Sequence, residues 1–436
     1  MDEEKVFKRY DIRGVYPEEL DEKFAELLGK SLGTFIQNKE YSKKLVVCRD
    51  NKNSSKPLKS SFIDGVLATG IQVIDIGTGP TDFAAFSGMK KDCVSVQVTA
   101  SHLSLKFNGF KFMYPQGNGF VNEDLNKVKT IFRERNFSQS PEAELKKDRA
   151  LSKSYREDLK SFVESKGEEW DKKIVVDTMG GATSSFLPSL LKGLGAEVVD
   201  LGDSKDRMPY RDPPNPKPGK LSELKQAVEE NDADIGLATD MDGDRVTLYK
   251  NGFISGNSVF AVFTKLFDGD KVASLDTSKA VEQVAESKGE EVFYTRVGDP
   301  FVLEKALDVK ASLAGEPNGH YAFLGFTAYS SGILSALILS GLDLEAYLED
   351  LPRYYSERRS ISVKNKEERM RELEKIIEKQ YTITSKADGL KIGEENFQVL
   401  VRPSGSSSKI RVITESKDPS MASEVVERFE KLVRNS

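Results

Sequence analysis

Short apolar runs alternate with longer amphipathic stretches over most of the chain. A short apolar run between turn-forming residues predicts a buried strand, and apolar residues three and four positions apart predict a helix. The predicted strands are residues 45–48, 72–76, 94–98, 110–114, 174–177, 197–201, 233–238, 246–249, 272–275 and 291–295. The predicted helices are residues 58–67, 81–89, 125–135, 184–193, 221–230, 259–266, 279–287, 301–307 and 332–340. Strands that alternate with helices in this way are typical of α/β domains with a parallel or mixed sheet.

The C-terminal part of the chain follows a different pattern, with more strands than helices. Its predicted strands are residues 360–363, 389–392, 397–401 and 409–414, and its predicted helices are residues 366–380 and 422–433. Strands and helices in this ratio favour a small α+β domain. We therefore expect three related α/β domains with mixed sheets and a smaller C-terminal α+β domain. Their predicted bounds are 1–147, 148–250, 251–355 and 356–436, with a linker or the start of a helix near 138–147.

The composition narrows the possible partners. A net charge of −6 argues against a nucleic-acid partner, because phosphate backbones attract clustered cations. The acidic residues 1–4 include no apolar region, so we expect no signal peptide. The longest apolar run, near residues 333–339, is too short to span a bilayer, so we expect no membrane contact. Cys48 and Cys93 lie in apolar segments, which is typical of reduced core cysteines in a cytoplasmic protein.

Three carboxylates alternate in residues 239–245, which we call the acidic loop. Asp240, Asp242 and Asp244 lie between two apolar runs, so the sequence predicts a strand, a tight loop and a second strand. Alternation in an extended loop can turn all three carboxylates toward one point, where they repel each other unless a cation lies between them. Oxygen ligands of this kind favour Mg²⁺. Mg²⁺ often completes its shell with a phosphate, so the acidic loop already suggests phosphoryl chemistry.

The acidic loop has other interpretations. It could be a solvated surface hairpin, because acidic turns are common on protein surfaces. An EF-hand fits poorly, because Gly243 stands at the fourth loop position and Asn251 at the twelfth, where that motif needs glycine at the sixth and glutamate at the twelfth. A phosphatase with an aspartate nucleophile is a third interpretation.

Both histidines of the chain lie in unusual surroundings. Ser101 and His102 follow the predicted strand 94–98, where a serine suggests a nucleophile or a phosphoryl acceptor, although an ordinary polar loop is also possible. Lys111 can return toward Ser101 through the turn at residues 108–109. His320 ends a polar loop, residues 315–320, whose Glu316, Asn318 and His320 offer donors and acceptors suited to a polyhydroxyl ligand. On local evidence a plain turn is the favoured interpretation there.

A serine-rich segment, residues 402–409, lies between two predicted strands of the C-terminal domain. Its hydroxyls and backbone N–H groups, with the flanking Arg402, Lys409 and Arg411, form a plausible phosphate cradle. A flexible linker is the alternative.

Taken in their order along the chain, the Ser101 segment, the acidic loop, residues 315–320 and residues 402–409 resemble four loops of the α-D-phosphohexomutase family, the phosphomannomutase/phosphoglucomutase and phosphoglucosamine mutase enzymes. The resemblance covers essentially the whole chain, and residues 7–14 are similar to the opening motif that carries an active-site arginine, here Arg13. It implies a heart-shaped, cytoplasmic, four-domain enzyme with a central cleft, a monomer or dimer that acts on a phosphosugar. It also implies Mg²⁺, and a hexose 1,6-bisphosphate as activator and intermediate.

The resemblance implies a role for each candidate residue. Ser101 would carry the phosphoryl group, and its phosphate would share the Mg²⁺ ion with Asp240, Asp242 and Asp244. Residues beside the reacting oxygens would be Arg13, His102, Lys111 and Arg245. Sugar-binding residues would be Lys279, Glu316, Asn318 and His320. Residues that bind the second phosphate would be Arg402, Ser404, Gly405, Ser406 and Arg411.

Several positions depart from the family pattern. Leu103-Ser104 replaces Asn-Pro, Ser406-Ser407-Ser408 replaces Thr-Glu-Pro, Asp299-Pro300 replaces a histidine and a basic residue, and Asn318 replaces serine. Ser331 stands where a carboxylate is often found, and Met241 where glycine is. The choice among mannose, glucose and glucosamine phosphates therefore stays open. So do two rivals to an active mutase, namely a weakly active phosphosugar-binding homologue and an aspartate-dependent phosphatase.

Overall fold

The computed structural model describes residues 3–39, 41–140, 143–166, 169–202, 208–405 and 407–435. The chain divides into two compact units, of which the first comprises residues 1–255 and 318–344 and the second residues 256–317 and 345–436. These units do not follow the predicted bounds, because residues 318–344 of the third predicted segment belong to the first unit. The four predicted bounds therefore stay predictions.

The first unit contains a mixed six-stranded sheet with the order β1-β5-β4-β2-β3-β6. β2 lies between β3 and β4 in parallel, and β6 is parallel to β3. β5 is antiparallel to β4 and to β1. The strands are β1 (Ile12–Val15), β2 (Lys44–Arg49), β3 (Gln72–Thr78), β4 (Val94–Val98), β5 (Phe107–Met113) and β6 (Leu145–Lys147). β6 lies in the segment predicted as a linker or helix start, so that prediction was wrong for residues 145–147.

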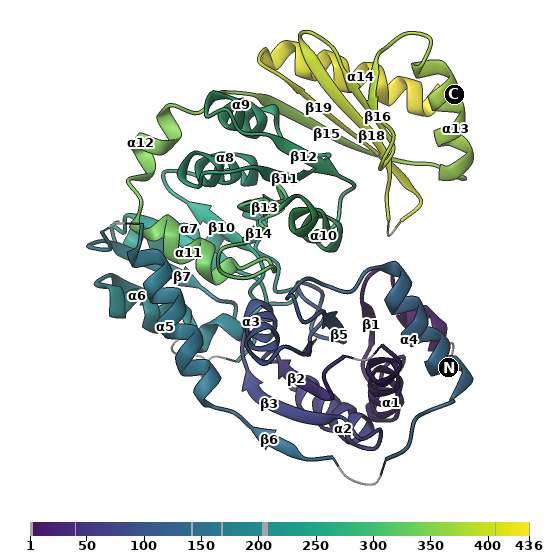
Figure 1. Cartoon of the computed structure of the whole chain (residues 1–436). Coiled ribbons are helices and arrows are strands. Elements are labelled where there is room, and N and C mark those ends of the chain that lie inside the picture. Colours follow the sequence, from purple (N-terminus) through teal and green to yellow (C-terminus); the bar gives the residue numbers. More distant parts are fainter. Residues whose placement is uncertain are drawn as a thin grey trace. The chain divides into compact units, whose positions relative to one another are not determined.

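Helices cover both faces of this sheet. α1 (Glu22–Asn38), α2 (Ser55–Leu67) and α4 (Asn122–Glu134) share one hydrophobic core with the strands, whereas α3 (Thr81–Lys91) packs on the opposite side (Figure 1). No element was predicted between residues 14 and 45, so α1 was missed. Its signals were present in the sequence, because Asp21 caps the helix by accepting from Phe24 N–H and apolar residues recur at helical spacing.

A second sheet in the first unit has the order β10-β9-β7-β8. β7 (Lys173–Asp177) lies in parallel between β8 (Glu197–Asp200) and β9 (Ile235–Thr239), and β10 (Val246–Tyr249) pairs with β9 in antiparallel fashion. α7 (Ser222–Glu230) packs on β7 and β9. The other elements here are α5 (Ala150–Glu164), η2 (Ala182–Ser185), α6 (Leu187–Leu194), β14 (Tyr321–Phe323) and α11 (Gly332–Gly341). α5 was not predicted, and the predicted helix 184–193 is split between η2 and α6.

The second unit contains a parallel β layer and an antiparallel sheet. β11 (Lys271–Ser274) pairs in parallel with β12 (Val292–Thr295) and β13 (Leu313–Gly315), accompanied by α8 (Gly256–Leu266), α9 (Lys279–Ser287) and α10 (Asp299–Val309). α12 (Leu344–Glu349) precedes the antiparallel sheet of order β15-β19-β18-β17-β16. Its elements are β15 (Tyr355–Ser362), β16 (Ile383–Ser385), β17 (Leu390–Gly393), β18 (Phe397–Pro403), β19 (Lys409–Ser416), α13 (Lys366–Ile377) and α14 (Pro419–Asn435). The predicted fold class of three mixed α/β domains and a C-terminal α+β domain is confirmed.

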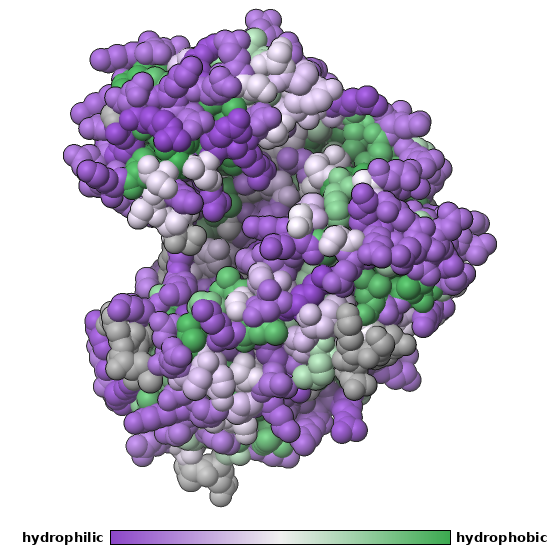
Figure 2. Space-filling view, turned by 180° about the vertical axis from the view of Figure 1, so that it is seen from behind, coloured by the Kyte–Doolittle hydropathy of each residue, from purple (hydrophilic) through white to green (hydrophobic). Residues whose placement is uncertain are grey.

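One face of the molecule carries little continuous apolar area. Figure 2 shows a face that is mostly hydrophilic, with small and separate apolar patches. Among the described residues, no helix is both long enough and apolar enough to cross a bilayer. Cys48 and Cys93 are buried and free, as the sequence predicted for core cysteines.

Candidate active site

The acidic loop connects β9 to β10 and is buried. Asp240, Asp242 and Asp244 each have at most 1% of their residue surface exposed, and one carboxylate oxygen of each lies within 4.8 Å of those of the other two. Burial, followed by the charges of Asp244 and Asp242, raises the pKa of Asp240 well above its usual value. The interpretation of the acidic loop as a solvated surface hairpin is therefore wrong.

Neighbouring backbone fixes the shape of the acidic loop. Gly243 has a φ of +72°, and a Cβ on it would lie 2.4 Å from Cγ2 of Thr183. Met241 is buried, and its carbonyl accepts a hydrogen bond of 2.7 Å from Ala182 N–H. From a later part of the sequence, Gly332 N–H donates to Gly243 O over 2.9 Å. Glycine is required at position 243 by its positive φ and by the close approach of Thr183.

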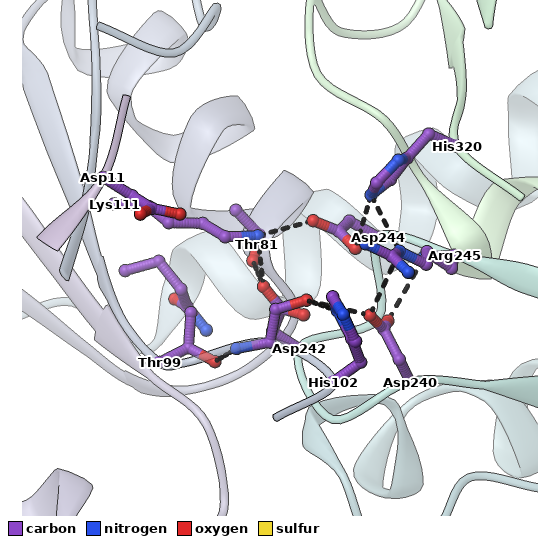
Figure 3. Close-up of polar contacts among 12 residues, drawn as sticks. Asp11, Thr81, Thr99, His102, Lys111, Asp240, Asp242, Asp244, Arg245 and His320 are labelled. Carbon is purple, nitrogen blue, oxygen red and sulfur yellow. Dashed lines mark hydrogen bonds and ion pairs between the residues drawn. The ribbon is translucent and has the colours of Figure 1, made fainter. Parts of the chain in front are cut away.

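A lysine supplies positive charge to the carboxylate cluster. Nζ of Lys111, on β5, lies 2.6 Å from Oδ2 of Asp242 and 2.5 Å from Oδ2 of Asp244 (Figure 3). Burial acts to lower the pKa of Lys111, but these two carboxylates raise it well above its usual value, so the side chain is protonated. Thr81 Oγ1 also donates to Asp242 Oδ2 over 2.8 Å. Asp242 Oδ1 is buried and accepts no hydrogen bond from the described part of the chain.

Ser101 lies at the end of β4, beside the acidic loop. Its hydroxyl donates to Oδ2 of Asp240 over 3.1 Å and lies 3.1 Å from Nδ1 of His102. The backbone of Ser101 has a φ of +51°, the left-handed region that residues other than glycine seldom adopt. Its N–H donates to Thr99 Oγ1 over 2.9 Å, which holds this conformation. Strained backbone of this kind is concentrated at functional sites.

A second layer of polar side chains supports Ser101. Asp50, buried after β2, accepts from Thr99 Oγ1 over 2.7 Å and from Ser55 Oγ over 2.5 Å. Asn108 in turn donates to Ser55 Oγ over 2.9 Å. Sequence reasoning missed Asp50, although an aspartate directly after an apolar strand was a usable signal.

The departure at Leu103-Ser104 does not leave this segment without support. Leu105 N–H donates to Asp212 Oδ1 over 2.9 Å, and Ser104 Oγ donates to Asp212 Oδ2 over 3.2 Å. Asp212 belongs to residues 209–218, a segment with five prolines that precedes α7, so this segment contacts the chain just after Ser101.

His102 and Arg13 complete the surroundings of Ser101. Burial first, and then the charges of Arg245 and Arg13, lower the pKa of His102 to about 2, so the imidazole is neutral at physiological pH. Arg13 lies on β1 and forms an ion pair of 2.5 Å with Asp11. Burial acts to lower the pKa of Arg13, but Asp11 and further nearby acidic groups raise it. Neither side chain is therefore a ready proton acceptor.

His320 lies against the acidic loop from the side opposite Lys111 (Figure 3). Its Nε2 is 3.1 Å from Arg245 Nε and 3.2 Å from Asp244 Oδ1, and the backbone N–H of His320 donates to Asn318 Oδ1 over 3.3 Å. Arg245 also lies 3.8 Å from Asp240. The structure thus brings His320 and Asn318 to Arg245 and Asp244 of the acidic loop. Glu316 belongs to the second unit, where its carboxylate accepts from Gly298 N–H over 2.8 Å.

The predicted phosphate cradle lies at the β18–β19 turn of the second unit. Arg402 is buried on β18, pairs with Asp388 over 2.7 Å, and has no partner for its Nε among the described residues. Ser404 N–H donates to Lys409 O over 2.8 Å, closing the turn. Gly405 and Arg411 are exposed. Ser406, the remaining predicted member, lies outside the described residues.

Lys279 is the first residue of α9 in the second unit. Its backbone N–H donates to Glu415 Oε2 of β19 over 2.9 Å. Lys279 therefore lies where the α/β part of this unit meets the C-terminal sheet.

Models of the phosphoglucomutase/phosphomannomutase family match four consecutive parts of the chain. The α/β/α domains I, II and III match residues 4–139, 153–252 and 255–354, and the C-terminal domain matches residues 360–432. A phosphoglucomutase/phosphomannomutase of Thermococcus kodakarensis is 32% identical over 99% of both chains. A probable phosphoglucosamine mutase of Methanosarcina acetivorans is 30% identical over 99% of both chains. A crystal structure of a phosphoglucomutase/phosphomannomutase family protein from Burkholderia thailandensis has a TM-score of 0.88 at 23% identity, covering 100% of this chain and 98% of the other.

Proposed function

Because the chain belongs to the phosphoglucomutase/phosphomannomutase family, and is therefore an isomerase of the phosphohexomutase type, we propose that it interconverts hexose 1-phosphates and hexose 6-phosphates of mannose, glucose or both. In this proposal Ser101 carries the phosphoryl group, and a bisphosphorylated sugar is the intermediate. The observation that carries it is the 3.1 Å hydrogen bond between the Ser101 hydroxyl and Asp240. This contact joins a phosphoryl acceptor to a buried cluster of three carboxylates.

The carboxylate cluster fits a hard divalent cation. Three buried carboxylates within 4.8 Å supply oxygen ligands, and Asp242 Oδ1 has no competing donor among the described residues. We propose that Asp240, Asp242 and Asp244 hold Mg²⁺, with an oxygen of the Ser101 phosphate as a further ligand. When bound, the ion would withdraw negative charge from the phosphoryl oxygens.

The proposed transfer step exchanges one phosphorus–oxygen bond for another. The bond from phosphorus to Ser101 Oγ breaks, a bond to a sugar hydroxyl oxygen forms, the sugar hydroxyl loses its proton, and Ser101 Oγ gains one. The other phosphate of the intermediate then returns to Ser101 by the same exchange in reverse. A hexose 1,6-bisphosphate would accordingly serve as activator.

Charged side chains near Ser101 would assist this exchange. Protonated Lys111 and Arg13 would stabilise negative charge on the phosphoryl oxygens, and Lys111 could protonate the departing oxygen. His102 would hold Oγ in place. Its Nδ1 would carry the proton, because the single proton of the Ser101 hydroxyl already goes to Asp240.

We propose further roles for residues outside the transfer step. Lys279, Glu316, Asn318 and His320 would bind the sugar, and Arg402, Ser404, Gly405, Ser406 and Arg411 would bind the second phosphate. Buried Arg402 carries this part of the proposal, because a guanidinium matches phosphate oxygens in a bidentate manner.

Phosphoglucosamine mutase is the second candidate. The observation that favours it is that relatives at 30% identity, including that of Methanosarcina acetivorans, are named probable phosphoglucosamine mutases. Both candidate functions would use Ser101, the acidic loop and the phosphate cradle in the same way. They differ only in which sugar phosphate is the substrate.

Initial rates on mannose, glucose and glucosamine 1-phosphates, measured side by side with Mg²⁺ and a trace of the matching bisphosphate, test the proposal. We expect turnover on at least one sugar, and near-complete loss in Ser101→Ala. Ser104→Ala is the matched control, because it removes a hydroxyl from the same segment, and among the described residues this hydroxyl bonds only to Asp212. Intact mass should show a phosphate adduct in Ser104→Ala and none in Ser101→Ala. Absence of turnover on all three sugars would refute the mutase function, and full activity in Ser101→Ala would favour a phosphatase.

A further inference from the structure

A buried carboxylate joins three helices near the acidic loop without touching it. Asp82 is the second residue of α3, is fully buried, and accepts two hydrogen bonds on one oxygen. Tyr155 of α5 donates to Oδ2 over 2.7 Å, and Ser331, which precedes α11, donates to the same atom over 2.5 Å. Both hydrogen bonds go to Oδ2, which joins the three helices, whereas Oδ1 is buried and has no hydrogen-bond partner among the described residues.

Two of the joined helices hold the acidic loop directly. Thr81, beside Asp82, donates from its N–H to Asp242 O over 2.9 Å and from Oγ1 to Asp242 Oδ2 over 2.8 Å. Gly332, beside Ser331, donates from its N–H to Gly243 O over 2.9 Å. A Cβ on Gly332 would lie 2.3 Å from Arg245 O, so the start of α11 is in direct contact with the loop backbone.

We propose that Asp82 is a positioning residue for the acidic loop, which ties the first turn of α3 to the first turn of α11 and thereby fixes Asp242 relative to Gly243 and Arg245. The inference rests on the proposed function, because it concerns the geometry of the proposed Mg²⁺ ligands. Asp82 would act through Thr81 and through Gly332, and would touch neither metal nor substrate.

The hydrogen-bond directions at this junction require an acceptor at position 82. Ser331 Oγ accepts from Leu334 N–H over 3.0 Å as the cap of α11, so its proton is directed to Asp82. Tyr155 is likewise a donor. An asparagine oxygen could replace the carboxylate oxygen, whereas alanine would leave two buried hydroxyls without an acceptor.

The positive ends of two helices favour an anion here, since Asp82 lies in the first turn of α3 and contacts the cap of α11. Burial acts in the opposite direction and raises the pKa of Asp82 to about 7, although the hydrogen bonds from Ser331 and Tyr155 lower it. Helix dipoles and hydrogen bonds thus favour the charged form of Asp82, and burial opposes it. Substitutions at position 82 can therefore change the hydrogen-bond acceptor and the charge separately.

Four variants separate these contributions, with Mg²⁺ affinity measured by titration calorimetry on the full chain. Asp82→Ala should weaken Mg²⁺ binding about tenfold, whereas Asp82→Asn should stay within about twofold of the wild type. Ser331→Asp places a second carboxylate against Asp82 and should weaken binding by more than about tenfold. In the double variant Asp82→Asn/Ser331→Asp a single carboxylate again faces a donor, so most of the affinity should return.

Ser335→Ala is the matched control. It removes a buried hydroxyl one turn further along α11, which donates to Ser331 O over 2.7 Å and does not contact Asp82. Its Mg²⁺ affinity should equal that of the wild type. At saturating Mg²⁺, the KM for the sugar phosphate should also be unchanged in Asp82→Ala, because Asp82 is expected to act on the metal ligands alone.

The outcomes distinguish this inference from the function on which it rests. Absence of Mg²⁺ binding by the wild type would refute the proposed metal site. Wild-type binding together with unchanged affinity in Asp82→Ala would overturn the positioning role alone. A double variant that binds no better than Ser331→Asp would also overturn it. If Ser331→Asp does not fold, the comparison of Asp82→Ala with Asp82→Asn decides.

Discussion

Lys111 and Asp242 form a buried ion pair in the middle of the acidic loop, with Nζ 2.6 Å from Oδ2. The same ammonium lies 2.5 Å from Asp244, so one positive charge compensates two carboxylates. Removal of one partner from a buried pair is expensive, because the other charge is then left uncompensated. The stability of the first unit therefore depends on the cations that this loop holds.

Lys111→Met should destabilise the metal-free protein by about 3 kcal/mol or more, because two buried carboxylates lose their counter-charge. Added Mg²⁺ should recover much more stability in this variant than in the wild type. Thermal unfolding with and without Mg²⁺ measures both effects. Lys59→Met is the control, because it breaks a single, partly buried ion pair with Asp75 away from the loop, and Mg²⁺ should not rescue it.

His102 should not titrate in the working range of the enzyme. Its pKa is lowered to about 2, so the imidazole is neutral from pH 5 to pH 8. Replacement by asparagine, which keeps an N–H donor for Ser101, should lower kcat/KM by about tenfold and leave the shape of the pH profile unchanged. An acidic limb near pH 6 that disappears in His102→Asn would contradict this prediction.

Asp82 should make stability fall as pH rises. Its folded-state pKa is raised from 3.8 to about 7, so the folded protein binds a proton more tightly than the unfolded chain does. The contribution of Asp82 to the free energy of unfolding is fully present below pH 3.8 and is lost as the pH rises through about 7. Asp82→Asn removes the titration, so its stability relative to the wild type should improve between pH 5 and pH 8. Urea unfolding of both proteins at pH 5 and pH 8 measures this change. An equal difference in unfolding free energy between Asp82→Asn and the wild type at both pH values would contradict the prediction.

Gly332→Ala should distort the acidic loop. The added Cβ would lie 2.3 Å from Arg245 O, and the loop or α11 must move, at a cost of about 1 to 3 kcal/mol. Mg²⁺ affinity should fall with it. Gly193→Ala is the matched control in α6, where a Cβ meets no atom within 4 Å, so stability should be unchanged or slightly higher. Calorimetric binding and urea unfolding of the two variants test the difference.

The chemistry of the site could be predicted from sequence where it is local. The alternation of carboxylates in residues 239–245 and the position of Ser101 after an apolar run depend only on strand geometry. The supports of these residues could not be predicted in this way. Thr81 bonds to Asp242 across 161 positions and Ser331 bonds to Asp82 across 249, and such pairs are set by the packing of helices onto sheets.

Other differences between the predicted and the observed elements have a local origin. α1 was missed although its cap and apolar spacing could be read from the sequence, whereas the split between η2 and α6 arises at Phe186, whose φ of −121° interrupts the helix. Residues 315–320 were treated as one loop. In the structure the two units are divided between residues 317 and 318, so Glu316 and His320 belong to different units.

The first unit is discontinuous, because residues 318–344 join it only after the chain has begun the second unit. His320 follows Arg245 by 75 residues, and Gly332, whose N–H supports Gly243, comes later still. During synthesis, which adds about 5 to 20 residues per second, the acidic loop is thus made several seconds before His320 and Gly332 emerge from the ribosome. A nascent chain that ends before residue 320 already contains Thr81, Ser101 and Lys111 but lacks the contacts of His320 and Gly332 with the acidic loop, so the site is completed late in translation.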